Sequence, residues 1–154
     1  MNTATPLARC IGRTPLRHRS RGMTLIELMT VVVVVAILGS IAVSSYRSYL
    51  LRTNRTEARM ALLRIQAAQE KFFLQNNRYA DNDELDDAPP AGLGVPTTTP
   101  SNYYTVSLTN VTDTTYTAQA VAANGQTQDK AACRTLTINH NGTRTPAQDS
   151  GCWR

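Results

Sequence analysis

A run of 21 residues, from Met23 to Val43, is almost wholly apolar and constrains this 154-residue chain more than any other feature. Polar residues and glycine interrupt it at Thr24, Glu27, Thr30, Gly39 and Ser40. As an α-helix rising about 1.5 Å per residue, the run is roughly 31 Å long, enough to cross the hydrocarbon core of a bilayer. Val31 to Val35 alone would suit a buried strand, but the apolar residues on either side favour one membrane-spanning helix.

The segment before this run carries the chain's excess positive charge. Residues 1–22 contain five arginines and no acidic residue, whereas the whole chain has 16 basic and 11 acidic side chains. The residues from Met23 onward are therefore formally neutral, which weakens an electrostatic argument for nucleic-acid binding. The basic segment resembles the charged n-region of an export signal, and the positive-inside tendency places it in the cytoplasm.

Glu27 is the residue of the apolar run that most needs a functional explanation. A carboxylate in a membrane helix costs about 2.5 to 3.5 kcal/mol on insertion scales, and such residues usually have a partner. If the chain is cut between Gly22 and Met23, the new amino terminus is a cation that Glu27 of a neighbouring subunit can neutralise. The alternative is an acid near a helix end that reaches the lipid headgroups.

A seven-residue motif stands between the basic leader and the rest of the apolar run: Gly22-Met23-Thr24-Leu25-Ile26-Glu27-Leu28. It resembles the class III signal of type IV prepilins and pseudopilins. The resemblance implies that a membrane peptidase cuts after Gly22, that Met23 becomes the N-methylated first residue, and that Glu27 sets the register in a filament. An ordinary secretory signal, cleaved near Ala42-Val43-Ser44, is the alternative, but its shorter apolar region would hardly tolerate Glu27.

Beyond Val43 the chain stays helical in pattern but becomes one-sided. Apolar residues recur at spacings of three, four and seven, at Leu51, Ala58, Leu62, Ile65, Ala68 and Phe72. No Gly or Pro occurs between residues 41 and 88, so we expect one amphipathic helix to about residue 76, with its apolar face against a sheet. Arg52, Arg55 and the arginines that follow are interpreted as a solvated or subunit-facing surface. No aromatic residues alternate with them, as a platform for single-stranded DNA requires.

The C-terminal half predicts a small antiparallel sheet. Strands are expected at 103–108, 115–122 and 134–139, with a turn at Asn141-Gly142 that leads into a short return strand. The acidic stretch 81–87 is interpreted as a solvated turn or a partner for neighbouring arginines. The expected fold class is α+β, a long N-terminal helix packed on this sheet.

Cys133 and Cys152 are separated by eighteen residues and lack a CxxC motif or a nearby histidine cluster. Such a pair favours a disulfide over a zinc site and implies an oxidising compartment. Closing a loop of that size stabilises a fold by roughly 3 kcal/mol in the chain-entropy model. The pair resembles the stapled C-terminal loop of type IV pilins. The segment 61–79 and the ending Cys152-Trp153-Arg154 are similar to those of PilE-type minor pilins.

No catalytic constellation is recognisable in the sequence, and His140 is the single histidine after the leader. We therefore expect no enzyme activity, no cofactor and no metal. The resemblance implies a structural subunit, a minor pilin of a type IV pilus, that supports pilus biogenesis, adhesion, twitching motility or DNA uptake. A major pilin or a type II secretion pseudopilin is the alternative, and a membrane-tethered module that binds a ligand or DNA is the rival from another class.

The expected organisation is a removed leader at 1–22, a long helix at 23–76 and a soluble pilin domain at 77–154. Within the helix, residues 23–43 form the transmembrane segment or filament core. Expected partners are other pilin subunits, the prepilin peptidase and N-methyltransferase, the inner-membrane assembly machinery and the inner membrane; DNA is a further partner without support in the sequence. The subunit is expected in the inner membrane with a periplasmic C-terminal domain, and then in the pilus at the cell surface.

Overall fold

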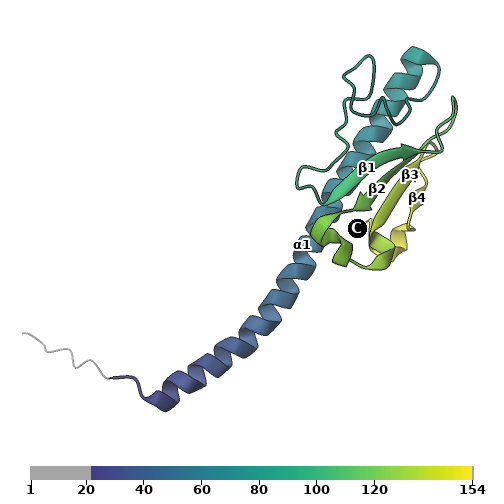
Figure 1. Cartoon of the computed structure of the whole chain (residues 1–154). Coiled ribbons are helices and arrows are strands. Elements are labelled where there is room, and N and C mark those ends of the chain that lie inside the picture. Colours follow the sequence, from purple (N-terminus) through teal and green to yellow (C-terminus); the bar gives the residue numbers. More distant parts are fainter. Residues whose placement is uncertain (1–21, 154) are drawn as a thin grey trace, which may run out of the picture. The chain divides into compact units, whose positions relative to one another are not determined.

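The computed structural model describes residues 22–153, so the predicted leader lies outside the described residues except for Gly22. The first element is a single long helix, α1 (Leu25–Asn76), drawn in blue to teal in Figure 1. The chain consists of two compact units, one ending at Ser40 and the other beginning at Ile41. The second unit therefore contains the second part of α1 together with all the strands.

In the first unit, α1 is an apolar helix with exposed side chains. Every residue from Gly22 to Ser40 is exposed, including the five consecutive valines Val31 to Val35. The helix is long and apolar enough in this part to cross a membrane. Apolar surface of this extent is unfavourable in water at roughly 25 cal/mol per Å², so this unit requires lipid or other protein around it.

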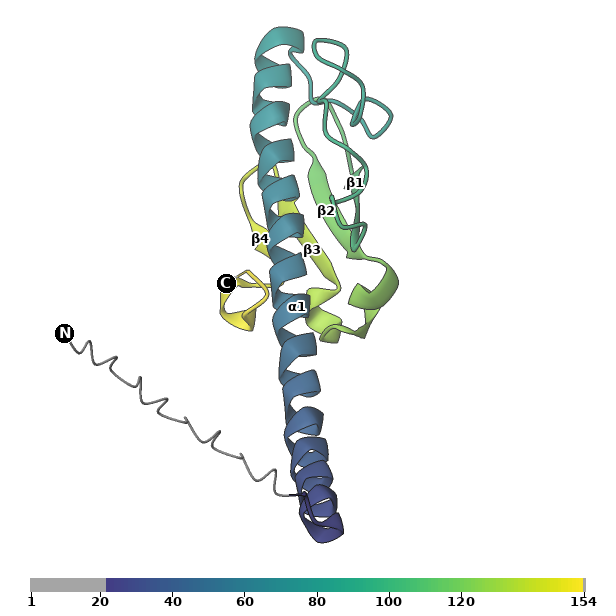
Figure 2. The ribbon, with the colours of Figure 1, turned by 90° about the vertical axis from the view of Figure 1, so that its left-hand side faces the viewer.

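In the second unit, one face of α1 is buried. Its buried residues are spaced by three and four, at Arg55, Ala58, Leu62, Ile65, Gln69 and Phe72. This spacing keeps all of them on one side of a helix, and that side lies against the sheet in Figures 1 and 2. Asn77 ends the helix in the left-handed conformation, with φ of 55°, and its N–H donates to the Phe73 carbonyl at 2.9 Å.

The sheet has four antiparallel strands in sequence order. They are β1 (Tyr104–Thr109), β2 (Thr117–Ala122), β3 (Thr135–Asn139) and β4 (Arg144–Thr145). Three short 3₁₀ helices accompany them: η1 (Asn124–Gln128), η2 (Ala131–Cys133) and η3 (Gln148–Ser150). The predicted α+β fold, with a long helix and a small antiparallel sheet, is confirmed.

The core of the second unit is formed by alternate residues of the strands and by the buried face of α1. On the strands these residues are Tyr104, Val106, Leu108, Ala118, Ala120, Leu136 and Ile138, and all are buried. The alternation places their side chains on one face of the sheet, where they meet Leu62 and Ile65 of the helix. This unit therefore has a core of its own.

Besides β1, which spans Tyr104–Thr109 rather than 103–108, three sequence expectations differ in detail from the structure. β2 begins at Thr117 rather than residue 115, because residues 110–116 form a turn in which the Thr112 N–H donates to the Thr115 carbonyl. β3 begins at Thr135, because the preceding Arg134 closes η2. The third difference is larger: Arg55 was expected on a solvated or subunit-facing surface, and this is wrong, because its side chain is buried against Asp129.

Candidate functional site

The predicted processing motif lies at the start of α1. Gly22 and Met23 precede the helix, and Thr24 is its N-terminal cap. The Glu27 N–H donates to Thr24 Oγ1 at 3.3 Å, and the Thr24 N–H donates to Glu27 Oε2 at 3.4 Å. These reciprocal bonds form a capping box, which satisfies two backbone N–H groups that a helix start leaves without partners.

The capping box fixes where the Glu27 carboxylate lies. It is held at the N-terminal end of α1, beside Thr24 and exposed. Negative charge is favourable at this end because the helix dipole is positive there. The same end of the helix carries Met23, where cleavage after Gly22 would create an amino terminus. The sequence analysis predicted a role for Glu27 but overlooked the Thr-x-x-Glu signal of the capping box.

The two C-terminal cysteines are joined in a disulfide. Cys133 ends η2, Cys152 lies close to the C-terminus, and both are fully buried. Their Cα atoms are 5.3 Å apart, within the ordinary range for a disulfide. The closed loop contains β3 and β4, so the bond ties the edge of the sheet to η2.

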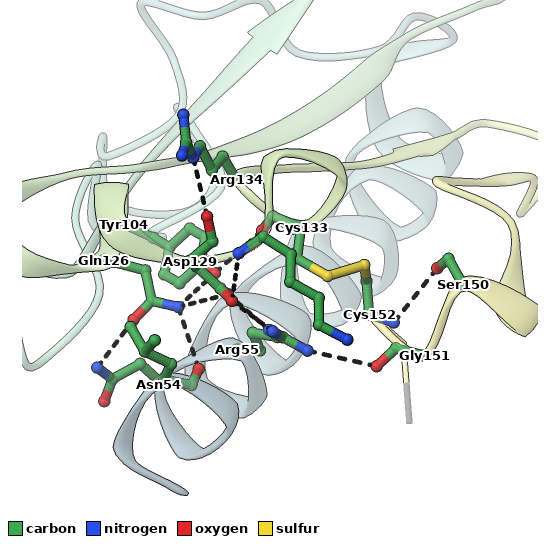
Figure 3. A network of polar contacts seen from close by, with 12 residues as sticks. Asn54, Arg55, Tyr104, Gln126, Asp129, Cys133, Arg134, Ser150, Gly151 and Cys152 are labelled. Atoms are coloured by element: carbon green, nitrogen blue, oxygen red, sulfur yellow. Dashed lines mark hydrogen bonds and ion pairs between the residues drawn. A yellow bond between two sulfur atoms is a disulfide. The ribbon is translucent and has the colours of Figure 1, made fainter. Parts of the chain in front are cut away.

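A buried polar network lies directly beside the disulfide (Figure 3). Arg55 Nε donates to Asp129 Oδ2 at 2.6 Å, and its Nη2 donates to Asp129 Oδ1, which makes a two-pronged ion pair. The exposed fractions of the two side chains are 8% and 2%. Arg55 Nη1 also donates to the Gly151 carbonyl at 3.4 Å, next to Cys152. Arg55 of α1 thus contacts the chain close to each of the two cysteines, at Asp129 before Cys133 and at Gly151 before Cys152.

Gln126 extends the network to other parts of the unit. The two N–H groups of its Nε2 lie within hydrogen-bonding distance of three acceptors: the Leu51 carbonyl at 3.0 Å, the Tyr104 hydroxyl at 3.1 Å and Asp129 Oδ2 at 2.9 Å. Its Oε1 accepts a hydrogen bond from Asn54 Nδ2 at 3.0 Å. The amide is fully buried and both of its ends are satisfied, so it fixes η1 against α1 and β1.

The ion pair shifts both pKa values. The hydrogen bond to Asp129 raises the pKa of Arg55 despite burial. Burial by itself raises the pKa of Asp129, but the hydrogen bonds from Arg55 and from the Lys130 N–H outweigh it, so the pKa of Asp129 lies below its ordinary value. The network therefore contains a carboxylate that stays ionised in the folded state.

The lowered pKa of Asp129 predicts a loss of stability in acid. Between the folded and unfolded pKa values, the unfolded chain binds more protons, so the free energy of unfolding falls as pH drops below about 4. Urea unfolding of the chain in detergent at a series of pH values measures this slope. The double variant Arg55→Met/Asp129→Leu should flatten it, whereas an equally steep slope in that variant would assign the acid sensitivity to other groups.

A groove runs along the helix in the second unit. It has a volume of about 620 Å³ and lies between α1 and the segment 95–102. Its walls are mainly apolar, with Met60, Val95 and Pro96 among them. Glu57 and Arg64, which also line it, already bind Ser101 and the Gly94 carbonyl. The groove therefore offers contact surface rather than a reactive group.

Metal-ligating side chains are not clustered among residues 22–153. In this part of the chain, no group of three or more His, Cys, Asp or Glu side chains is arranged to hold a metal ion. His140 lies beside the β3–β4 turn, where its backbone N–H donates to the Tyr116 carbonyl at 3.1 Å. In the acidic stretch, Glu84 pairs with Arg78 at 2.5 Å, one of the two roles expected for these acids.

Two family models match this chain. One, described as "Type IV minor pilin ComP, DNA uptake sequence receptor", matches residues 44–137. The other, described as a prokaryotic N-terminal methylation motif, matches residues 17–43 and so includes Gly22, Met23 and Glu27. Together they cover both α1 and most of the sheet.

Individual relatives agree with these models. Type IV major pilin protein PilA of Myxococcus xanthus is 40% identical over 75 residues, covering 48% of this chain and 34% of PilA. PilE1, a type IV major pilin protein of Neisseria gonorrhoeae, is 31% identical over 89 residues, covering 58% of this chain and 39% of PilE1. Type II secretion system core protein G of Pectobacterium carotovorum is 30% identical over 67 residues, covering 44% of this chain and 43% of core protein G.

The match therefore spans less than half the length of each of these relatives. Among solved structures, the non-core minor pilin PilV of Neisseria meningitidis aligns with a TM-score of 0.47 and 24% identity, covering 64% of this chain and 87% of that one. The family assignment rests on the family model that matches residues 44–137. The chain belongs to the type IV pilin family, within the group of minor pilins that this model describes.

Proposed function

We propose that the chain is a structural subunit of a type IV pilus, a minor pilin that assembles through the first part of α1. One observation carries the proposal. Residues 25–40 form an exposed apolar helix with a carboxylate fixed at its start, whereas the unit from Ile41 onward buries its own core. A helix of this kind requires lipid before assembly and neighbouring helices afterwards.

The proposed route begins with cleavage after Gly22 and methylation of the Met23 amine. The helix is then stored in the inner membrane with the disulfide-containing unit in the periplasm, an oxidising compartment in which Cys133 and Cys152 can pair. On extraction, the valine-rich surface exchanges lipid for other subunits. Glu27 neutralises the amino terminus of a neighbouring subunit. Packing arrangements in which the two helices are shifted along each other, so that these charges separate, cost free energy. The role is structural rather than enzymatic.

The direct test is the covalent structure of the protein in its native membrane. We expect an intact mass and an N-terminal sequence that begin at methylated Met23, with two hydrogens fewer than the reduced chain because of the disulfide. A Gly22→Leu variant should stay uncut, because cleavage is expected to require glycine at that position. A wild-type chain that is uncut, or that begins near Ser44, would contradict the proposal and favour a tethered or secreted binding module.

DNA binding is a second candidate function, supported by the description of the matching family model as a DNA uptake sequence receptor. The exposed cations Arg52, Lys130 and Arg134 belong to the matched region and offer a surface for phosphate groups. The charges from Met23 onward remain balanced overall, and this balance favours the structural role.

A further inference from the structure

The unit from Ile41 onward is joined to the apolar run at one end of its helix. Two tyrosines follow that junction, and their side chains are 63% exposed at Tyr46 and 65% exposed at Tyr49. On a helix rising about 1.5 Å per residue, they lie about 4.5 and 9 Å past Val43. The headgroup layer on each side of a bilayer core is about 5 to 7.5 Å thick. With Val43 at the edge of the hydrocarbon, both rings fit the interface, where tyrosine is enriched in membrane proteins.

Two arginines accompany these tyrosines on α1. Arg47 and Arg52 are exposed and lie about 6 and 13.5 Å past Val43 on the helix. Side chains of a helix tilt toward its N-terminus, so both guanidinium groups are directed back toward the apolar run. Among residues 22–153, neither side chain takes part in a hydrogen bond or an ion pair. Both cations therefore remain available to phosphate groups of a membrane surface.

The segment that contains η1 brings a third exposed cation to the same end of the unit. Gln126 lies 3.0 Å from the Leu51 carbonyl, and Asp129 binds Arg55, as Figure 3 shows. This segment therefore packs on the part of α1 that directly follows the tyrosines. Lys130 is the next residue, and its side chain is exposed. Residues 124–130 thus add a cation from outside the helix.

The carboxylates at this end do not cancel its positive charge. Arg55 neutralises Asp129, and Glu57 accepts two hydrogen bonds from Ser101. Asp149, in η3, is the remaining one, and it is exposed. Segments 44–59, 124–134 and 147–152 together contain six basic and three acidic side chains: Arg47, Arg52, Arg55, Arg59, Lys130, Arg134, Glu57, Asp129 and Asp149. The end is therefore basic although the residues from Met23 onward are formally neutral.

We propose that these residues form a juxtamembrane surface, made of Tyr46, Arg47, Tyr49, Arg52 and Lys130, which binds the headgroups of anionic phospholipids before assembly. The tyrosines lie among the headgroups, and the three cations attract their phosphates. The folded unit is then held against the leaflet from which α1 emerges, rather than moving freely on its helix. The proposal rests on the proposed function, in which the helix is stored in the membrane, and adds a lipid partner for the unit outside it.

The position of the surface favours lipid over DNA as the source of phosphate. The surface lies at the end of the unit that is joined to the membrane-spanning run, so lipid headgroups are present at high local concentration without a binding step from solution. The two exposed tyrosines are explained by a membrane interface. A DNA duplex would need the cations alone, and the formal neutrality from Met23 onward weakens long-range attraction for it.

Single-molecule energy transfer in nanodiscs tests the proposal with the full chain. A donor dye is attached at the exposed position 128 through Gln128→Cys, and Cys10→Ser removes the other free thiol. Acceptor dyes on lipid headgroups then report how often the unit lies against the bilayer. Nanodiscs of phosphatidylcholine are compared with nanodiscs that contain roughly one third phosphatidylglycerol. The chain is anchored in both, so the ratio of docked to undocked molecules reports the surface contact alone.

We expect the docked-to-undocked ratio to be at least about tenfold higher on the anionic nanodiscs, since each cation near an anionic surface is worth about fivefold. Lys130→Gln should lower the ratio about fivefold, and Arg52→Gln/Lys130→Gln about 25-fold. In 1 M salt the Debye length is about 3 Å, so the difference between the two lipids should disappear.

The matched control is Lys71→Gln, which removes an exposed lysine at the other end of the unit. Lys71 lies 28 residues past Val43 on α1, about 42 Å along the helix, so the docked-to-undocked ratio should stay within about twofold of wild type. Equal ratios on the two lipids, or equal losses in Lys71→Gln and Lys130→Gln, would overturn the proposal. Binding of a DNA duplex through Arg52 and Lys130, without added docking on anionic lipid, would also overturn it and assign the cations to DNA.

Insertion and filament assays separate this proposal from the function on which it rests. A chain that inserts and enters sheared surface filaments, but docks equally on both lipids, would remove the lipid contact and leave the pilus subunit role intact. A chain that docks on anionic lipid but is absent from filaments would keep the lipid contact and remove the pilus role. A chain that does not insert into a bilayer would remove both.

Discussion

The Glu27→Ala variant is expected to insert into the membrane as well as wild type or better, yet to be depleted from surface filaments at least about a hundredfold. Insertion is kept or improved because the substitution removes a charge from an apolar helix; a charged side chain costs roughly 2.5 to 3.5 kcal/mol at the centre of such a helix, and Glu27 lies near its start. Assembly fails because the amino terminus of the neighbouring subunit loses its counter-charge in an apolar environment. An unpaired buried charge costs about 3 to 5 kcal/mol, and each 1.4 kcal/mol is about tenfold in an equilibrium.

The capping box makes it possible to separate the charge of Glu27 from its hydrogen bond to the helix start. A glutamine at position 27 can still accept the bond from the Thr24 N–H, because Glu and Gln serve equally in a capping box. Glu27→Gln should therefore keep the helix start but fail in assembly like Glu27→Ala. The reverse control, Thr24→Val, removes the Thr24 hydroxyl and leaves the charge.

Immunoblots of membrane and sheared-filament fractions measure both steps for each variant. Normal filament levels in Glu27→Gln, together with loss in Thr24→Val, would mean that Glu27 acts by capping the helix. The counter-charge mechanism would then be wrong. Normal filament levels in all three variants would leave Glu27 without a role in assembly.

The features that sequence analysis predicted are those encoded by residues close together in the chain. The apolar run and the three- and four-residue spacing of Ala58, Leu62 and Ile65 define α1, because periodicity alone reports which face is buried. The alternation in 103–108 predicts a strand for the same reason, and Asn77 ends the helix as a residue that tolerates the left-handed conformation.

The buried network could not be predicted in this way. Asp129 is 74 residues from Arg55, and nothing local to either residue identifies the partner. A weaker signal was present, however. Arg55 and Gln69 fall in the same three- and four-residue spacing as the apolar residues of α1, so the face that packs on the sheet contains two polar positions. A polar residue in a buried stripe requires a buried partner, and that requirement indicates a network without naming its members.

Truncation of Arg55 is expected to have the largest effect on stability. Arg55→Ala leaves the Asp129 carboxylate buried without its counter-ion, and breaking a buried pair on one side costs about 3 to 5 kcal/mol. It also removes a donor to the Gly151 carbonyl beside the disulfide. Urea unfolding in detergent, followed by the fluorescence of Trp153, the only tryptophan in the chain, measures the change close to the site.

The matched control is Arg52→Ala on the same helix. Arg52 is exposed, so its removal should change the free energy of unfolding by less than about 0.5 kcal/mol. The difference between the two arginines then reports burial and pairing rather than helix propensity or net charge, because both substitutions are Arg to Ala in α1.

The double variant Arg55→Met/Asp129→Leu decides what the ion pair contributes. Replacing both charges by apolar side chains of similar size removes the unpaired carboxylate, so most of the stability lost in Arg55→Ala should return. Gln126 and the Gly151 carbonyl lose partners in this variant, which predicts a recovery that falls short of wild type by about 1 to 3 kcal/mol. If the double variant loses as much unfolding free energy as Arg55→Ala, the surrounding hydrogen bonds rather than the ion pair account for the stabilisation. A loss below about 1 kcal/mol in Arg55→Ala itself would show that water or another group solvates Asp129, and the network would then not be what holds the disulfide loop to α1.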